Sequence, residues 1–147
     1  MTVVIRDAEP RDEAGWRGLW QQYLDFYEVA LAPEVTAATW ARLVDPASPV
    51  KARLAFDGGR MVGFAIHLHH PSTWVIGEDC YLEDLFLAPE ARGKKIGKRL
   101  IDDLIALARA KGWQRLYWHT DEENAVARRL YDRFVPADGH VRYRMKL

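Results

Sequence analysis

Apolar residues recur along the chain in two kinds of spacing, which together predict a mixture of helices and strands. Steps of three and four residues are typical of one helical face. They occur within residues 16–27, 34–43, 96–108 and 124–134. Alternating or continuous apolar runs are typical of strands. They occur within residues 3–6, 50–56, 61–68, 80–87, 113–119 and 140–147. The predicted order βααβββαβαβ indicates a mixed α/β sheet domain.

Turn-forming residues separate these elements at the expected places. Asp57-Gly58-Gly59 predicts a tight hairpin, because Asp-Gly readily adopts the positive φ angles that such a turn requires. Pro89 interrupts the pattern after residues 80–87, and Gly112 ends the longest helical stripe. No repeat or linker divides the chain, so we expect residues 1–147 to form a single domain.

Composition narrows the class of protein. Lys plus Arg and Asp plus Glu each number 21, so the formal net charge is zero. This balance argues against nucleic acid or an anionic membrane as a partner. No apolar run approaches the roughly 20 residues of a membrane span, and the N-terminal residues lack the apolar core of a signal peptide. The single cysteine, Cys80, favours a reducing compartment, and we expect a cytoplasmic protein.

A basic, glycine-containing segment stands directly before the longest predicted helix. Residues 92–99 read RGKKIGKR and carry five basic side chains. Helix N-termini attract anions, because their first amides lack partners within the helix and the helix dipole favours negative charge. The segment is therefore typical of a loop that holds a diphosphate. The alternative is a solvated basic helix start after an ordinary turn.

This segment resembles the acetyl-CoA loop of the GNAT N-acetyltransferase superfamily, whose pattern is Arg or Gln, two residues, Gly, one residue, then Gly or Ala. The preceding YLEDLFL at 81–87 and the segment 124–131 are also similar to that superfamily. Within it, they resemble the diamine and polyamine acetyltransferases and the yeast histone and polyamine acetyltransferase branch. The resemblance implies a mostly antiparallel central sheet flanked by helices, with two splayed parallel strands forming an acyl-CoA wedge.

The resemblance also implies acetyl-CoA as the cofactor. The backbone at Leu85, Phe86 and Leu87 would pair with the pantetheine amides, and Asn124 would contact the pantetheine and ADP arm. The diphosphate would be held by Arg92, Gly93, Lys94, Lys95, Ile96, Gly97 and Lys98. Lys95 stands where the family usually has its first loop glycine. Its side chain could crowd the diphosphate or turn outward and neutralise it, so we expect altered contacts rather than an inactive site.

Two residues match the family's catalytic positions. Glu83 is expected to take a proton from the ammonium group of the acceptor, with a purely electrostatic substrate-holding role as the alternative. Tyr131 is expected to protonate the departing thiolate, because a phenol of pKa ~10 stays protonated at neutral pH. Core packing is the alternative for Tyr131. Strand alternation predicts that Asp84 points to the face opposite Glu83.

Aromatic and acidic residues are expected to form the mouth that admits a cationic acceptor. These residues are Trp20, Tyr23, Tyr27, Glu28, Trp74 and Asp84. A dimer contact would equally explain some of the aromatic residues. The five histidines show no metal-binding spacing, so we expect no metal site.

Taken together, the residues and the resemblance predict an acetyl-CoA-dependent N-acetyltransferase. It would transfer acetyl directly to a primary amine, with a small polyamine-like or amino-acid amine as the first choice. A protein lysine or N-terminus is the alternative acceptor, and a non-catalytic acyl-CoA sensor is the alternative of a different class. The resemblance also implies a homodimer. The zero net charge conceals a segregation, because residues 78–90 hold five acidic groups and residues 92–99 hold five basic ones.

Overall fold

The computed structural model describes residues 2–147, which contain a five-stranded sheet in the order β1-β2-β3-β4-β5. Its strands are β1 (Val3–Asp7), β2 (Val50–Asp57), β3 (Arg60–Pro71), β4 (Glu78–Leu87) and β5 (Leu116–Trp118). The first three pairings are antiparallel, and β4 with β5 is parallel. The predicted mixed, mostly antiparallel sheet is confirmed.

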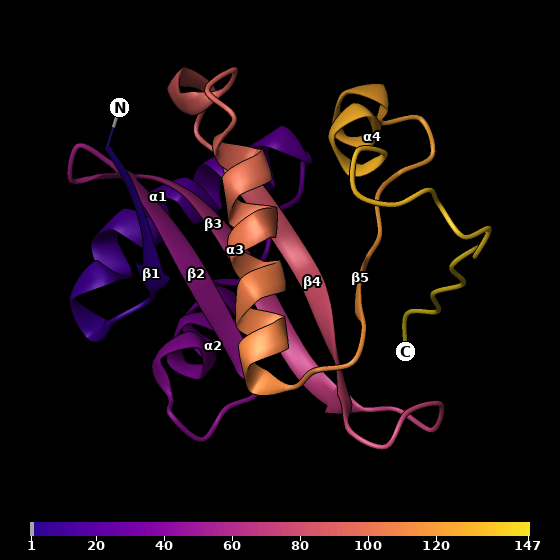
Figure 1. Cartoon of the computed structure of the whole chain (residues 1–147). Helices are drawn as coiled ribbons and strands as arrows, with labels where there is room; N and C mark the ends of the chain where they lie inside the picture. The colour runs from indigo at the N-terminus through magenta and orange to yellow at the C-terminus, as the bar shows by residue number, and fades with distance from the viewer. Residues whose placement is uncertain (1) are drawn as a thin grey trace.

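Helices cover both faces of the sheet (Figure 1). They are α1 (Glu13–Phe26), α2 (Pro33–Val44), α3 (Ile96–Lys111) and α4 (Ala125–Tyr131), with short 3-10 helices at Pro10–Asp12 and Pro89–Ala91. One core lies under α1 and α2 and includes Trp16, Leu54 and Phe64. The other lies under α3 and includes Ala65 and Leu100. Alternation along the buried strand β3 supplies both cores, because successive side chains point to opposite faces.

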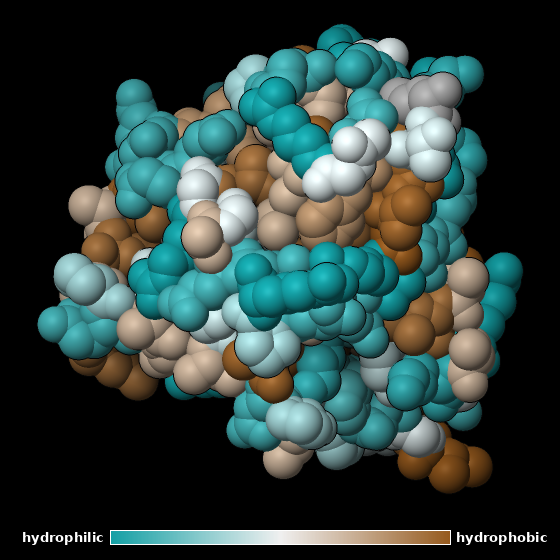
Figure 2. All heavy atoms as spheres, turned by 90° about the vertical axis from the view of Figure 1, so that its left-hand side faces the viewer, coloured by the Kyte–Doolittle hydropathy of each residue, from teal (hydrophilic) through white to brown (hydrophobic). Residues whose placement is uncertain are grey.

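The surface on the side of β1 and α1 carries hydrophilic side chains interrupted by separate apolar patches (Figure 2). The apolar stripe of α1 faces the sheet, because Trp16, Leu19, Trp20 and Leu24 are buried in the core beneath it. Among residues 2–147, no helix combines the length and apolarity that a membrane crossing demands.

Strand β4 has two irregularities near the predicted site residues. In the pairing with β3, Asp84 lies opposite Ile66 and Leu82 lies opposite His67, so Glu83 is the extra residue of a β-bulge. On its other side, β4 pairs with β5 only through Cys80–Leu82. No strand of residues 2–147 pairs with that side from Glu83 to Leu87. This open edge is the splayed parallel pair that the resemblance implies.

The C-terminal segment differs from the prediction. Residues 140–147 form no strand, so the prediction of a closing strand is wrong. Apolar and polar residues do alternate in this segment, but no strand of the described chain pairs with it. Figure 1 shows this segment running beyond β5 as an irregular trace. Four apolar side chains are left 75–109% exposed, namely Val141, Tyr143, Met145 and Leu147.

Candidate active site

The basic loop joins the open end of β4 to the start of α3. Gly93 and Lys95 both have positive φ angles, of 80° and 61°. Lys95 is the N-terminal cap of α3, and no side chain caps the helix there. The first amides of this 16-residue helix are therefore available to an anion.

Several basic side chains of the loop have partners. Lys94 lies 3.7 Å from Asp57, and Lys98 lies 2.6 Å from Asp102. The Arg92 guanidinium lies over the rings of Phe26 and Phe86, with its carbon 5.4 and 5.8 Å from their centroids. Within residues 2–147, Lys95 forms no ion pair, and it is exposed. Unlike Lys94 and Lys98, Lys95 can therefore bind an anion without first leaving a carboxylate partner.

Gly97 and Ile96 have packing roles that the motif alone did not reveal. Ile96 is fully buried in the α3 core, so only its backbone can meet a ligand. A Cβ at Gly97 would lie 3.3 Å from Leu130 and 3.5 Å from Leu87. The glycine therefore allows α3, α4 and β4 to approach one another closely. Gly93, in contrast, is surrounded by open space.

The predicted pantetheine segment lies on the open edge of β4. Phe86 is buried in the α1 core, while Leu85 and Leu87 pack against the α3 core. Their side chains hold the strand in place, and the backbone groups on the side away from β3 are unpaired by any strand of the described chain. Such an edge can pair with the amides of an extended ligand whatever the side chains are.

Asn124 begins α4 beside this edge. Its side-chain oxygen accepts a hydrogen bond from the backbone N–H of Ala127 at 3.1 Å, as helix caps do. The sequence predicts Asn124 as a cofactor contact, and the structure shows that its side-chain oxygen also holds the helix start in place.

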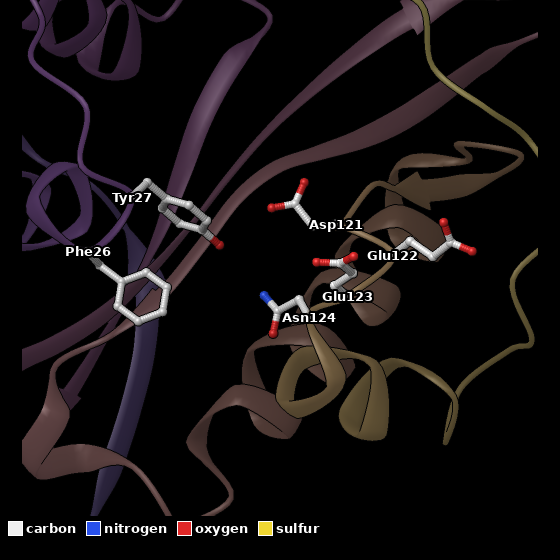
Figure 3. A pocket seen from close by; sticks show the side chains of 6 residues that line it. All are labelled: Phe26, Tyr27, Asp121, Glu122, Glu123 and Asn124. Atoms are coloured by element: carbon white, nitrogen blue, oxygen red, sulfur yellow. The ribbon is translucent and has the colours of Figure 1, made fainter.

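An open pocket of about 600 Å³ lies between the end of α1 and the start of α4. It is lined by Phe26, Tyr27, Asp121, Glu122, Glu123 and Asn124. Figure 3 shows the Tyr27 hydroxyl and the carboxylates of Asp121 and Glu123 turned towards the gap, whereas Glu122 points away. Phenol and carboxylate groups thus meet across this pocket.

Tyr131, the candidate acid, lies on α4 and is partly buried against the ring of Trp118, with centroids 5.6 Å apart. Burial, with a smaller contribution from the Tyr27 phenol, raises the pKa of Tyr131 to about 12. It is therefore protonated at neutral pH, as a proton donor must be.

Glu83 and Asp84 occupy different environments. Glu83 is exposed at the bulge. Asp84 is partly buried and accepts a 2.7 Å hydrogen bond from the Tyr23 hydroxyl. Burial raises the pKa of Asp84 to about 6, the hydrogen bond opposes the rise, and the charge of Glu83 adds to it. Regular alternation would place Leu82, Asp84 and Phe86 on one face, yet Leu82 packs in the α3 core while Asp84 bonds to Tyr23 of α1 and Phe86 packs in the α1 core. The bulge at Glu83 therefore interrupts the alternation on which the predicted separation of Glu83 and Asp84 rests.

The remaining predicted acceptor residues divide into two groups. Tyr27 lines the pocket, and Glu28 follows it with a φ of 55° at the exposed end of α1. Trp20 is only 7% exposed and its indole N–H donates to Thr36, so the structure corrects its assignment from mouth to core. Trp74 is 85% exposed before β4 begins, and about 17 Å of strand separates the start of β4 from Glu83. The structure does not bring Trp74 to the pocket.

The acidic lining of the pocket was missed by sequence reasoning. Asp121, Glu122 and Glu123 stand immediately before the cap of α4. A run of three acidic residues between a strand and a helix cap was the available signal, but such a run usually marks a solvated loop. Phe26 was not among the predicted site residues either, although it neighbours Tyr27. Within residues 2–147, no group of three or more His, Cys, Asp or Glu residues is arranged to hold a metal ion.

Comparison with known proteins identifies this arrangement. A model of the Acetyltransferase (GNAT) family matches residues 16–134, which include β4, the basic loop, α3 and α4. The chain belongs to the GNAT acetyltransferase family. This GNAT protein is 35% identical over 144 residues to the D-amino-acid N-acetyltransferase HPA3 of Saccharomyces cerevisiae, covering 97% of the chain and 89% of that protein.

Two further similarities concern part of the sequence and the fold. The GNAT chain is 37% identical over 79 residues to a thialysine N-epsilon-acetyltransferase of Caenorhabditis elegans, covering 54% of the chain and 49% of that protein. Its fold is similar to that of AAC(6')-Iy, solved in complex with the bisubstrate analog CoA-S-monomethyl-acetylneamine. The TM-score is 0.83 at 20% identity, and both chains are covered completely.

The GNAT protein is an acetyl-CoA-dependent N-acetyltransferase. Its residues fit the cofactor, because the uncapped start of α3 and the free ammonium of Lys95 suit a diphosphate. The open edge of β4 suits the amides of pantetheine. Acetyl-CoA supplies the acetyl group as a thioester.

Proposed function

We propose that this enzyme transfers acetyl directly to the primary amine of a small cationic molecule. The observation that carries the proposal is the acidic and aromatic pocket beside the open edge of β4. Burial and the charges of Asp121 and Asp84 raise the pKa of Tyr27. Tyr27 therefore lies between the carboxyl groups of β4 and those of the segment before α4, a surrounding that favours a bound cation.

The proposed chemistry divides between β4 and α4. The acidic residues of β4 receive a proton from the ammonium group, since only the neutral amine is a nucleophile. By resemblance, Glu83 occupies the family's acid–base position on this strand. Tyr131 donates a proton to the departing sulfur, and its pKa of about 12 keeps the phenol protonated at neutral pH until the thiolate forms.

The loop and strand edge position the other substrate. We propose that Lys95, Arg92 and the first amides of α3 hold the diphosphate, while the β4 edge aligns the pantetheine arm. Fixing the thioester next to a bound amine replaces a bimolecular encounter by an intramolecular one, which contributes much of the rate.

The names of the relatives support a small acceptor. HPA3 is a D-amino-acid N-acetyltransferase, and the nematode relative is a thialysine N-epsilon-acetyltransferase. The acidic lining of the pocket favours acceptors whose carboxylate is absent or distant from the reacting amine. We therefore place diamines and the side-chain amines of lysine-like molecules ahead of α-amino groups next to a carboxylate.

A panel of amines tests this proposal. Purified protein is mixed with acetyl-CoA, a thiol-detecting reagent and, separately, a diamine, a polyamine, lysine, D- and L-amino acids and a lysine-containing peptide. We expect amine-dependent release of CoA, fastest with the diamine or the lysine side chain. Release that is fastest with the peptide would support a protein acceptor. Binding of acetyl-CoA without release by any amine would support the sensor and contradict the proposal.

We further propose one acetyltransferase domain over residues 1–147 that acts as a homodimer in the cytoplasm. The exposed apolar residues Val141, Tyr143, Met145 and Leu147 support a contact between copies, because a stable monomer seldom exposes such a series. Cys80 is fully buried, and burial raises the pKa of its thiol to about 12. An unreactive single thiol is consistent with a reducing compartment.

A further inference from the structure

The bulge at Glu83 leaves two adjacent carboxyl groups at one site, and their surroundings differ. We propose that Asp84, held in place by Tyr23, accepts the proton from the acceptor amine, while the exposed Glu83 holds the ammonium group electrostatically. This inference rests on the proposed function and assigns the proton-accepting role within it.

The hydrogen bond fixes one oxygen of Asp84 and leaves the other for the substrate. Oδ1 accepts from the Tyr23 hydroxyl at 2.7 Å. Oδ2 accepts no hydrogen bond from residues 2–147, and it is not among the polar atoms sealed from solvent. Asp84 can therefore receive a proton on Oδ2, from the ammonium directly or through one water, without breaking its contact with Tyr23.

Tyr23 is itself held rigidly. Its ring centroid lies 5.6 Å from those of both Phe64 and Phe86, and 5.1 Å from that of Tyr27. With Trp20 at 5.4 Å, four aromatic neighbours surround the ring and leave the phenol little freedom to rotate away. The Asp84 carboxyl is consequently oriented by the core, whereas the exposed Glu83 has no hydrogen-bond partner among the described residues.

The charged and titratable groups around Asp84 come from its own strand and three neighbouring segments. Tyr23 on α1 and Tyr27 at the C-terminal cap of α1 face it, Glu83 and Tyr81 lie on its own strand, and Asp121 and the cation of Arg92 lie beyond Tyr27. The β3 residue paired with Asp84 is the uncharged Ile66. Burial is the largest cause that raises the pKa of Asp84, to about 6. A carboxyl with this pKa accepts a proton at neutral pH more readily than an ordinary aspartate does.

Neighbouring carboxyl groups in unlike surroundings often divide two roles in this way, one staying ionised and the other exchanging a proton. The ammonium gives one proton to Asp84, and the amine nitrogen bonds to the acetyl carbon as the carbon–sulfur bond breaks. Tyr131 protonates the sulfur and is reprotonated from the second nitrogen proton through solvent. Asp84 then releases its proton to solvent, so the products are the amide, the thiol and one proton.

The test is the pH dependence of kcat/KM and kcat in four variants. We expect Asp84→Asn to lower kcat at least 100-fold. Tyr23→Phe should move the acidic limb of the profile to higher pH. The hydrogen bond from Tyr23 lowers the pKa of Asp84 in the wild type, so its removal raises that pKa. Glu83→Gln should move this limb to lower pH without abolishing it, because the Glu83 charge raises the pKa of Asp84. The same variant should raise KM, because it loses the charge that holds the ammonium group. Asp45→Asn, an exposed aspartate at the end of α2, is the matched control.

The opposite pattern overturns the proposal. If Glu83→Gln abolishes the acidic limb while Asp84→Asn retains turnover, Glu83 is the base and the enzyme is still an acetyltransferase. A measurement that needs no turnover separates the role of Asp84 from the proposed acetyl transfer. The NMR signal of the Asp84 carboxyl carbon is assigned by its loss in Asp84→Asn and followed as the pH is changed. We expect a midpoint near 6 that rises in Tyr23→Phe. A midpoint near the ordinary ~3.9 contradicts the assignment even if no amine in the panel is acetylated.

Discussion

At the scale of single residues, Lys95 and Glu28 carry backbone conformations that glycine adopts more easily. They are the non-glycine residues with positive φ among residues 2–147, at 61° and 55°. The sequence shows Lys95 only as a departure from the family pattern, whereas its φ explains why that pattern has glycine there. Both residues lie at predicted binding positions, and backbone strain is often retained at such sites.

Replacing Lys95 should separate strain from charge. Lys95→Gly removes the strained left-handed conformation, so we expect the free energy of unfolding to rise by about 0.5–1 kcal/mol. The same change removes a cation from the loop and should weaken acetyl-CoA binding. Lys95→Ala should weaken binding equally without the gain in stability. Denaturant unfolding and calorimetric titration with acetyl-CoA measure the two effects, and equal affinity in all three proteins would show that Lys95 does not bind the cofactor.

Asp84 should limit stability at neutral pH. Its folded-state pKa, about 6, lies above the ordinary value, so the folded protein binds the extra proton and its stability falls as pH rises from about 4 to 6. Asp84→Asn keeps an acceptor for Tyr23 without the charge. We expect this variant to be more stable than the wild type by about 1–3 kcal/mol at pH 8, with the difference vanishing near pH 4. A constant difference across this range would contradict the buried-charge argument.

At the scale of elements, the sequence predicted what local periodicity and turn residues determine. The apolar stripe of α3, its end at Gly112 and the hairpin between β2 and β3 were all predicted and are confirmed. The bulge at Glu83 was not predictable, because it depends on the register with β3. Trp20 shares a helical stripe with Tyr23, and only the position of α2 beside it places Trp20 in the core.

The C-terminal segment shows the limit of periodicity. Alternation in residues 140–147 predicts a strand, yet a strand also requires a partner edge, which no local pattern supplies. The same reasoning applies to β5, which shortens from the predicted 113–119 to Leu116–Trp118 because only three residues pair with β4. Long-range pairing therefore decided both outcomes.

Deleting residues 140–147 should affect assembly rather than the fold. These residues are exposed and form no strand, and His140 contacts only the exposed Asp138, so we expect the truncated monomer to lose less than about 0.5 kcal/mol of unfolding free energy. If the segment forms the proposed contact between copies, light scattering will give a dimer for the full chain and a monomer for the truncated one. Equal masses for the two proteins would exclude this segment as the dimer contact.

At the scale of the whole molecule, the zero net charge is a sum of separated parts. The acidic residues of the segment before α4 line the pocket, and the charge of Asp84 on β4 reaches the pocket residue Tyr27, while the basic loop lies at the start of α3. A cationic amine and a polyanionic cofactor are thus attracted to neighbouring but different regions. Neutral composition is compatible with two oppositely charged substrates.

Acetyl transfer between these two regions with Tyr131 as the proton donor is the central claim. Its most direct test is amine-dependent CoA release by Tyr131→Phe, with Tyr117→Phe, at a tyrosine of β5 whose hydroxyl contacts His70, as the matched control. Tyr131→Phe keeps the ring that packs on Trp118 and removes the proton. We predict a loss of kcat of about 100-fold or more at unchanged acetyl-CoA affinity, with no change in the control. Wild-type turnover in Tyr131→Phe would contradict the account.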